Sequence, residues 1–454
     1  MTYDVAVVGG GPGGYVAAIK AAQKGLSVVL FEKDKLGGVC LNRGCIPTKA
    51  LLKSAAVYES AQNAAKFGIG NNNVTVDWTA VMKRKETVVS QLVRGIGGLV
   101  KGNGITLVNA EATLKDAHTV LADGKEYAAK NIILATGSQP VLPPIEGIQN
   151  QNVMTSDGML QISELPENMV IIGGGVIGLE FAFLLSSFGR KVTIIEMLGS
   201  IIANADEDVI AAVTKDIQKA GVTVITGARV KKIEEAAVVY EKDGKETRVG
   251  ASHVLVSTGR KASADTVMLD RLGIKYNRGV IETDEAMHTN VPGVYAIGDA
   301  NGKMMLAHTA SEEGIVAVEN ICGEAAKMDY SLIPQCIYAT PEVAWAGMTE
   351  RQAREAKKDI KVGVFPMAAN GKSLIEDETG GFVKVISDSK YGEVLGVHMV
   401  CAHATDMIAE AVLAMKTECC VEDIAHCIHA HPTVSEAVME AANAAIGKAI
   451  HSLR

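Results

Sequence analysis

Two cysteines, Cys40 and Cys45, stand close together in the run GGVCLNRGCIPTKALL, directly after a glycine-rich segment. Pro47 suits the first turn of a helix, because a residue there needs no hydrogen bond from its backbone nitrogen. Residues 47–61 continue without a helix breaker, so Cys45 is expected near a helix N-terminus, where partial positive charge favours a thiolate. We therefore predict a reversible dithiol that carries two electrons. Two unrelated reduced thiols are the competing interpretation.

Upstream of the cysteines, residues 3–32 follow the order strand, glycine-rich turn, helix, strand. Gly9, Gly11 and Gly14 have the spacing GxGxxG, and Glu32 ends the second strand. Such glycines let the backbone turn tightly and approach a pyrophosphate, which rests on the helix N-terminus. Glu32 is placed to accept hydrogen bonds from a ribose. The complete unit predicts a dinucleotide-binding site.

The same unit recurs in residues 169–197, where Gly173, Gly175, Gly178 and Glu196 take the corresponding positions. Two complete fingerprints predict two dinucleotide sites. Glu196 should hold both hydroxyls of an adenosine ribose and repel a 2′-phosphate. No Lys or Arg occurs from 192 to 214, so the second site is predicted to take NAD and not NADP. A solvated strand end is the alternative for either glutamate.

Three further strand ends are candidates for cofactor contact. Thr136-Gly137 and Thr258-Gly259 each follow an apolar strand, at positions where the chain is expected to cross between the nucleotide domains. Asp299 follows the apolar run GVYAIG, and ligands gather at the carboxyl ends of strands in open α/β sheets. We predict that Asp299 binds a cofactor hydroxyl, the alternative being an ordinary acid in a surface turn.

From about residue 330 the apolar pattern alternates as in an antiparallel sheet, with Ala-rich helices around it. Near its end, His431 is followed by Pro432 and then by Glu436. The proline is expected to end one helix and start the next, so that the histidine projects from a rigid bend. A carboxylate within reach would orient the ring and raise its basicity, which suits a general base. A capping or packing histidine is the competing interpretation.

The other cysteines and histidines do not indicate a metal site. The cluster around residues 419–431 has no CxxC…HxxxH spacing, so we predict no metal. Its members are Cys419, Cys420, His426, Cys427, His429 and His431. Cys322, Cys336 and Cys401 stand alone in apolar surroundings and are expected to be core thiols.

Bulk properties narrow the function classes. A chain of 454 residues with 48% hydrophobic residues and a net charge of -8 predicts several well-packed domains and no nucleic-acid partner. No uncharged apolar run approaches the roughly 20 residues that span a bilayer. The first strand leaves no room for a signal peptide. Eight cysteines in so long a chain do not make a disulfide scaffold, which favours a reducing cytoplasm.

The two fingerprints, GGxCLNxGCIPTK between them, AIGDA and HAHPTxSE together resemble the pyridine nucleotide–disulphide oxidoreductase family over essentially the whole chain. The resemblance implies an α/β fold with two Rossmann-like dinucleotide-binding domains and a C-terminal α+β dimerisation domain. The implied domains are 1–142 for FAD, 143–262 for NAD, 263–330 completing the FAD site, and 331–454 forming the interface. It also implies a homodimer, in which the His-Glu pair of one subunit completes the disulphide site of the other.

The resemblance implies a role for each matching residue. Cys45 would face the flavin, Cys40 would exchange with substrate, and His431 would be the base that Glu436 orients. Lys49 would lie by the flavin and pair with Glu180 at the nicotinamide side. The implied FAD-site residues are Gly9, Gly11, Pro12, Gly14, Glu32, Lys33, Lys49, Ala112, Thr136, Gly137, Asp299, Met305, Leu306, Ala307 and His308, the last through its backbone. The implied NAD-site residues are Gly173, Gly175, Gly178, Glu180, Glu196, Val230 and Gly259.

The activity implied is oxidation of protein-bound dihydrolipoyl groups to lipoyl groups, with reduction of NAD⁺. The implied partner is a lipoylated acyltransferase core or the lipoyl carrier protein of glycine cleavage, and no lipoyl domain is expected on this chain. Arg43 departs from the family pattern, where a small apolar residue is usual, and adds positive charge beside the dithiol. Reduction of another disulphide, NADH-dependent diaphorase activity, or a docking subunit that only retains FAD are the alternatives. The lack of a phosphate clamp and the internal position of Cys419-Cys420 count against glutathione and mercuric reductases.

Overall fold

The first fingerprint folds into a parallel strand–helix–strand unit. In the computed structural model, which describes residues 2–70, 72–356 and 359–452, β1 (Thr2–Val8) pairs in parallel with β2 (Val28–Phe31) and β6 (Lys125–Leu134). Helix α1 (Pro12–Gln23) connects β1 to β2. Residues 5–8 of β1 are buried, as expected of a parallel strand covered on both faces. The seven-stranded sheet is completed by β3 (Thr106–Val108), β4 (Ala112–Asp116), β5 (Thr119–Ala122) and β19 (Val294–Ala296).

The second fingerprint builds a five-stranded parallel sheet in the order β11-β10-β9-β15-β8. Helix α6 (Val176–Ser187) follows β9, and an antiparallel sheet of three strands packs against the parallel sheet through its own buried core. The strands of the two sheets are β8 (Val153–Met154), β9 (Asn168–Ile172), β10 (Lys191–Ile195), β11 (Thr223–Ile225), β15 (His253–Val256), β12 (Arg229–Ile233), β13 (Ala237–Lys242) and β14 (Lys245–Gly250).

The two units are alike in their turns as well as in their order. A Cβ atom on Gly14 would lie 1.8 Å from the carbonyl oxygen of Gly9, and one on Gly178 would lie 2.2 Å from that of Gly173. Only glycine permits these contacts between helix and turn. The internal repeat predicted from the sequence is therefore present in the backbone.

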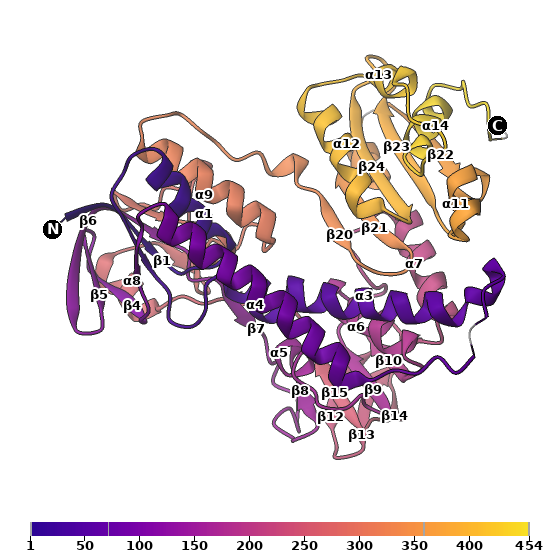
Figure 1. The fold of residues 1–454 in the computed structure, drawn as a ribbon, viewed down its shortest axis with the longest axis horizontal. Helices are drawn as coiled ribbons and strands as arrows, with labels where there is room; N and C mark the ends of the chain where they lie inside the picture. The colour runs from indigo at the N-terminus through magenta and orange to yellow at the C-terminus, as the bar shows by residue number, and fades with distance from the viewer. Residues whose placement is uncertain (1, 71, 357–358, 453–454) are drawn as a thin grey trace.

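The C-terminal region is an antiparallel sheet in the order β20-β21-β24-β23-β22, covered by helices (orange to yellow in Figure 1). The fold class predicted from the sequence is thus confirmed. The elements are β20 (Gln335–Ile337), β21 (Glu342–Gly347), β22 (Ile360–Pro366), β23 (Phe382–Asp388), β24 (Val394–Cys401), α10 (Glu350–Glu355), α11 (Gly371–Glu376), α12 (Ala404–Lys416), α13 (Val421–His426) and α14 (Glu436–Ala445).

One detail of this region differs from the prediction. Pro432 neither ends a helix nor starts one, because α13 ends at His426 and α14 begins at Glu436. The backbone N–H of Thr433 donates to the Glu436 carboxylate, at 2.9 Å, so helix α14 starts where an acidic side chain can hold the incoming loop.

Two long helices join the parts of the molecule. α3 (Cys45–Gln62) runs horizontally through the middle of Figure 1, and α4 (Trp78–Gly102) crosses it from the first domain. One buried cluster takes Leu51 from α3, Trp78 from α4, Phe181 from α6 and Trp345 from β21. The first residues of α3 are therefore held where all three folded parts meet.

The remaining elements complete the first domain and the crossing between domains. β7 (Ser138–Pro140) pairs with β16 (Arg260–Ala262). The two Thr-Gly strand ends, which directly precede these strands, therefore lie side by side where the chain passes between the two nucleotide domains. The domain boundaries at 142, 262 and 330 stay predictions. The other helices and strands are α2 (Gly38–Arg43), α5 (Ser156–Met159), α7 (Glu207–Lys219), α8 (Thr266–Leu272), α9 (Ala307–Ile321), β17 (Tyr276–Asn277) and β18 (Val280–Ile281).

No helix in the described ranges is long and apolar enough to cross a membrane.

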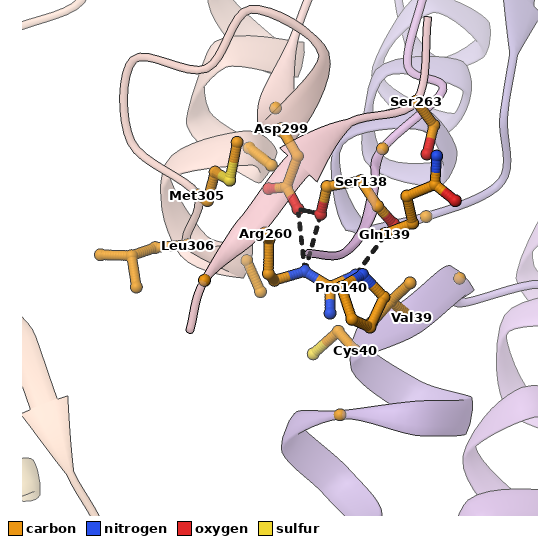
Figure 2. A pocket seen from close by; sticks show the side chains of 18 of the residues that line it. Val39, Cys40, Ser138, Gln139, Pro140, Arg260, Ser263, Asp299, Met305 and Leu306 are labelled. Atoms are coloured by element: carbon orange, nitrogen blue, oxygen red, sulfur yellow. Dashed lines mark hydrogen bonds and ion pairs between the residues drawn. The ribbon is translucent and has the colours of Figure 1, made fainter. Parts of the chain in front are cut away.

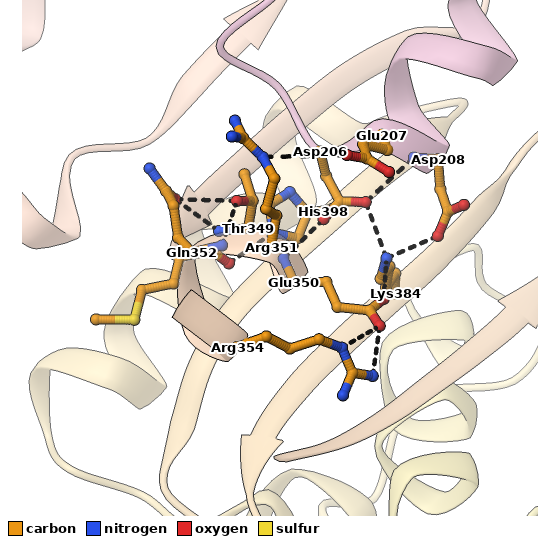
Figure 3. Close-up of polar contacts among 11 residues, drawn as sticks. Asp206, Glu207, Asp208, Thr349, Glu350, Arg351, Gln352, Arg354, Lys384 and His398 are labelled. Atoms are coloured by element: carbon orange, nitrogen blue, oxygen red, sulfur yellow. Dashed lines mark hydrogen bonds and ion pairs between the residues drawn. The ribbon is translucent and has the colours of Figure 1, made fainter. Parts of the chain in front are cut away.

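A buried ionic cluster fastens the second dinucleotide domain to the C-terminal sheet (Figure 3). Lys384 of β23 is 1% exposed, and its Nζ lies 2.8 Å from Asp206, 2.7 Å from Asp208 and 2.8 Å from Glu350. Burial opposes ionisation of Asp206, yet Lys384 and the backbone N–H of Glu350 outweigh it and hold the pKa of Asp206 below its usual range. Three carboxylates from two domains thus share one buried ammonium.

Lys384→Met should cost about 3–5 kcal/mol of unfolding free energy, because Asp206 would be left buried without the ammonium that pairs with it, while Glu350 keeps Arg354. Urea unfolding at neutral pH measures the loss. The loss should shrink as the pH falls, since Asp206 in the variant lacks the Lys384 ammonium that lowers its pKa and takes up a proton at a higher pH than in the wild type. Lys115→Met, at the exposed Lys115–Glu126 pair, is the matched control and should change the midpoint far less. Equal losses of unfolding free energy in the two variants would contradict the proposed contribution of the cluster to stability.

Candidate functional site

The dithiol lies where α2 ends and α3 begins. Cys40 is on α2 and Cys45 is the first residue of α3, and both side chains are half-buried. A hydrogen bond from the Cys40 thiol and the charge of Lys49 lower the pKa of Cys45, although burial and Glu180 act against them. The same hydrogen bond, together with burial, raises the pKa of Cys40 well above its usual range. Cys45, which lies at the start of α3 near Lys49, therefore gives up its proton more readily than Cys40.

Lys49 links the dithiol to the second dinucleotide domain. Its Nζ lies 2.8 Å from both carboxylate oxygens of Glu180, which is 3% exposed on α6. The backbone N–H of Tyr338 donates to the same carboxylate at 3.2 Å, and Lys49 also lies 4.6 Å from the centre of the Tyr338 ring. Burial raises the pKa of Tyr338 to about 12, so this phenol stays neutral. The ammonium is thus fixed one helical turn beyond Cys45.

A cavity of about 2420 Å³ runs from the first fingerprint, past the dithiol, to the second fingerprint. It is large enough for two dinucleotides, since pockets for single ligands are roughly 300–1,000 Å³. The predicted residues that line it are Gly9, Gly11, Pro12, Gly14, Glu32, Lys33, Cys40, Cys45, Lys49, Ala112, Thr136, Gly137, Gly173, Gly175, Glu180, Glu196, Val230, Gly259, Asp299, Met305, Leu306, Ala307 and His308. Gly178, His431 and Glu436 do not line it.

Gly178 lies behind the cavity wall. Its Cα faces the carbonyl oxygen of Gly173 in the close contact described above, so it lets α6 approach the turn. Its predicted place in the NAD site is therefore indirect. The cavity side of that turn belongs to Gly175, where an added Cβ would meet no atom within 4 Å.

The residues at the first fingerprint fit FAD. The hydroxyl oxygen of Thr136 is buried and has no hydrogen-bond partner among the described residues, at a point that lines the cavity. A Cβ on Gly137 would project into open space, and one on Gly11 would come no closer than 4.0 Å to another atom. Glu32 accepts from the backbone N–H of Gly10 at 2.8 Å and of Asp34 at 2.7 Å, which holds the carboxylate at the end of β2. Each carboxylate oxygen keeps a second lone pair for a ribose hydroxyl.

The second fingerprint holds its glutamate in the same way. Glu196 accepts from the backbone N–H of Gly174 at 2.6 Å and of Leu198 at 2.7 Å. The carboxylate lines the cavity beside Val230, and Gly259 at the neighbouring strand end leaves open space. A fixed carboxylate suits the two hydroxyls of an NAD ribose and opposes a 2′-phosphate.

The turn that carries Asp299 is tied to the domain crossing, as Figure 2 shows. Arg260 donates to the Ser138 hydroxyl at 2.7 Å and to the Ser138 carbonyl oxygen at 2.8 Å, and it lies 4.0 Å from Asp299. The Ser138 hydroxyl donates to Asp299 in turn. The group faces the same cavity as Cys40 and orients Asp299.

Arg260 and Ser138 were not predicted as site residues. Each directly follows one of the two Thr-Gly strand ends, at Gly137 and Gly259, and that position was the available signal. Tyr338 was missed as well, because its contact with Glu180 uses a backbone N–H that any residue carries.

His308 lines the cavity, and its ring is held by Pro334, which lines it as well. The ring Nε2 lies 3.0 Å from the carbonyl oxygen of Pro334, and burial lowers the pKa of the imidazole. This arrangement agrees with a residue that takes part through its backbone, which stays a prediction.

Two expectations from the sequence need correction, and Arg43 has two partners that the sequence did not indicate. Its guanidinium lies 3.7 Å from Asp34 and 3.9 Å from Asp157. Cys322 is not a core thiol but is exposed where α9 ends. Cys336 lines the cavity on the edge strand β20, and burial raises its pKa to about 11. Only Cys401 is buried as predicted.

His431 and Glu436 form a pair of their own on the C-terminal domain. His431 Nδ1 lies 3.0 Å from Glu436 Oε1, and the histidine side chain is 78% exposed. The carboxylate can therefore orient the ring, while Nε2 is left facing outward. Neither side chain reaches the dithiol of its own chain through the cavity.

No group of three or more His, Cys, Asp or Glu side chains in the described part of the chain could hold a metal ion.

The site places a pair of cysteines between two dinucleotide-binding fingerprints, and a separate C-terminal sheet follows them in the chain. This combination is that of a flavoprotein disulphide oxidoreductase. Residues 3–314 match the model of the pyridine nucleotide-disulphide oxidoreductase family, and residues 333–442 match the dimerisation domain of that family. The chain belongs to this family, whose cofactors are FAD and NAD(H).

Individual relatives are similar over their full length. The dihydrolipoyl dehydrogenase of Geobacillus stearothermophilus is 43% identical over 457 residues, which is 99% of this chain and 97% of that protein. The dihydrolipoyl dehydrogenase of Staphylococcus aureus is 41% identical over 459 residues, 99% of this chain and 98% of that protein. Among solved structures, the HOCl-induced flavoprotein disulfide reductase from Escherichia coli matches with a TM-score of 0.87 and 28% identity, covering 97% of this chain and 99% of that one.

Lys49→Met should raise the pKa of Cys45 by roughly one pH unit or more, because the nearby cation is lost and the charge of Glu180 is uncovered. The pH dependence of iodoacetamide alkylation, with Cys45 followed by peptide mapping, measures the shift. Lys53→Met, an exposed lysine one turn further along α3, should leave the midpoint in place. An unmoved midpoint in Lys49→Met would contradict the role of the ammonium.

Glu196→Arg should reverse the preference between NAD⁺ and NADP⁺, because it replaces a carboxylate that repels the 2′-phosphate with a cation that binds it. Dissociation constants of NADH and NADPH, from fluorescence titration, test this. Glu246→Arg makes the same charge change on the exposed strand β14 and should leave the preference unchanged. Retained selectivity in Glu196→Arg would show that another residue selects the nucleotide.

Proposed function

We propose that this chain is a dihydrolipoyl dehydrogenase, which oxidises dihydrolipoyl groups on carrier proteins to lipoyl groups and reduces NAD⁺. The observation that carries the proposal is the dithiol at the start of α3, inside a cavity that joins both dinucleotide fingerprints. Full-length similarity to dihydrolipoyl dehydrogenases supports the choice of substrate. The chemistry that the bound cofactors supply is the transfer of two electrons from the dithiol to NAD⁺.

The thiol steps follow from the residues of the chain. In the oxidised enzyme Cys40 and Cys45 form a disulphide, and His431 Nε2 takes a proton from one dihydrolipoyl thiol. The resulting thiolate attacks Cys40 Sγ, the Cys40–Cys45 bond breaks, and Cys45 leaves as a thiolate. The second lipoyl thiol then displaces Cys40 Sγ from the mixed disulphide, and its proton passes to the departing Cys40 thiolate, while the first proton stays on His431. Oxidised lipoyl departs and two reduced cysteines remain.

The stability of the leaving thiolate makes the first exchange favourable. Cys45 leaves readily because the nearby Lys49 ammonium lowers its pKa, and a low pKa speeds the departure of a thiol. Cys40, with the raised pKa, is proposed as the sulfur that bonds to the substrate, and Cys45 as the one that faces the flavin.

His431 and Glu436 are proposed to act on the dithiol of a partner subunit. The pair lies on the dimerisation domain, outside the cavity of its own chain, and presents an exposed ring. The working enzyme is therefore proposed to be a homodimer with two composite sites. Glu436 is held ionised by the Thr433 N–H and by His431, which lower its pKa against the effect of burial.

The natural electron donor is proposed to be a lipoylated acyltransferase core of a 2-oxo acid dehydrogenase complex or the lipoyl carrier of glycine cleavage. The proposed location is the cytoplasm, where the eight cysteines, all free in this structure, would stay reduced outside the catalytic cycle. Reduction of another disulphide by NADH is the second candidate, supported by the likeness to a flavoprotein disulfide reductase.

Cys45→Ser should abolish dihydrolipoamide-dependent formation of NADH, because no leaving sulfur remains for the exchange. The purified flavoprotein is assayed by NADH absorbance with dihydrolipoamide and NAD⁺. Cys322→Ser, at an exposed cysteine outside the cavity, should keep full activity. Turnover of glutathione disulphide or mercuric ion in place of dihydrolipoamide would favour the second candidate. Activity retained in Cys45→Ser would contradict the relay.

A further inference from the structure

The loop between α13 and α14 contains a second histidine–carboxylate pair that the proposed reaction does not use. His429 Nε2 lies 2.8 Å from Glu410 Oε1 on α12, and its side chain is only 7% exposed. His431, two residues later, is 78% exposed. The loop thus buries one histidine against a helix and presents the next one.

The contacts of His429 define its protonation state. Its Nδ1 lies 3.0 Å from the carbonyl oxygen of Cys427, and its Nε2 faces the Glu410 carboxylate. A carbonyl oxygen and an ionised carboxylate only accept hydrogen bonds, so both ring nitrogens must donate. The imidazolium form of His429 makes both hydrogen bonds, and its hydrogen bond to Glu410 raises the pKa of the ring against the effect of burial.

The other end of the loop is also anchored. Asn370, the residue before α11, donates its side-chain amide to the carbonyl oxygen of Thr433 at 3.0 Å. The Thr433 hydroxyl donates to the carbonyl oxygen of Ala430 at 2.7 Å. His431 therefore stands between a charged anchor on α12 and a neutral anchor on α11.

We propose that the ion pair of His429 with Glu410 is the positioning element that holds His431 where it can take the substrate proton. This inference rests on the proposed function. The pair acts through the loop backbone, because α12 packs on the C-terminal sheet and the loop reaches α12 through His429. The imidazolium also places a positive charge beside the His431–Glu436 pair. The ionisable groups that act on His429 are Glu410 and Glu436.

The test compares His429→Phe and Glu410→Gln with the wild-type holoenzyme in two reactions. The first is dihydrolipoamide oxidation by NAD⁺, which requires His431. The second is NADH oxidation by ferricyanide, which requires the cofactors but not a base for the thiol. The expected result is a fall in kcat/KM for dihydrolipoamide of roughly tenfold to a hundredfold, with the ferricyanide rate within about twofold of wild type.

The pH dependence of kcat/KM for dihydrolipoamide shows whether His429 positions His431 or only stabilises the fold. In His429→Phe the imidazolium is lost, which makes protonation of His431 easier. The acidic limb of kcat/KM in that variant should therefore move up by roughly half a pH unit. His288→Phe, at the His288–Asp284 pair of another domain, is the control and should leave both reactions and the limb in place. Glu410→Gln keeps the side-chain shape, and it covers the case in which His429→Phe does not fold.

Three results would overturn the inference: unchanged kcat/KM in both variants, equal losses in both reactions, or an acidic limb that does not move. Wild-type enzyme that fails to oxidise dihydrolipoamide would overturn the proposed function and this inference with it. An active wild type with unaffected variants would overturn only the role of His429.

Discussion

The ion pair between Lys49 and Glu180 is the contact on which the redox site depends. Lys49 stands one turn after Cys45 on α3, and Glu180 lies buried on α6 of the second dinucleotide domain. An ammonium in this place stabilises a thiolate at Cys45, and the buried carboxylate keeps the ammonium from leaving the cavity for water. One interaction thereby sets the charge of the sulfur and the position of one domain against another.

The rest of the fold serves to hold this contact. The core around Leu51 and Phe181 fixes α3 against α6, and the cluster around Lys384 fastens the second dinucleotide domain to the C-terminal sheet. Buried ion pairs contribute little net stability, because desolvation offsets their attraction, but they are costly to break. Ion pairs at two domain contacts suit a molecule in which two nucleotide sites and a dithiol must keep fixed positions relative to one another.

Much of this arrangement could be predicted from the sequence, because it is local. The GxGxxG spacing, the acidic strand end and the proline after Cys45 each reflect one turn of backbone, and the two fingerprints form matching strand–helix–strand units. The family resemblance added Lys49 and Glu180, which the structure brings together although they are far apart in the chain.

The rest of the site depends on tertiary contacts that leave no local pattern in the sequence. Arg260 meets Ser138 only because β7 and β16 pair, and Tyr338 contacts Glu180 through its backbone. Arg43 contacts Asp157, which is more than a hundred residues further along the chain, so no local pattern indicates this pair.

The central claim is that one sulfur pair at the start of α3 carries the electrons. Anaerobic titration of the oxidised protein with dihydrolipoamide, without NAD⁺, followed by rapid alkylation and peptide mapping, tests it most directly. The account predicts that the thiols newly exposed to the alkylating agent belong to the peptide that contains Cys40 and Cys45, with Cys336, Cys401 and the other cysteines unchanged. New thiols on any other cysteine, with that peptide unaltered, would contradict it.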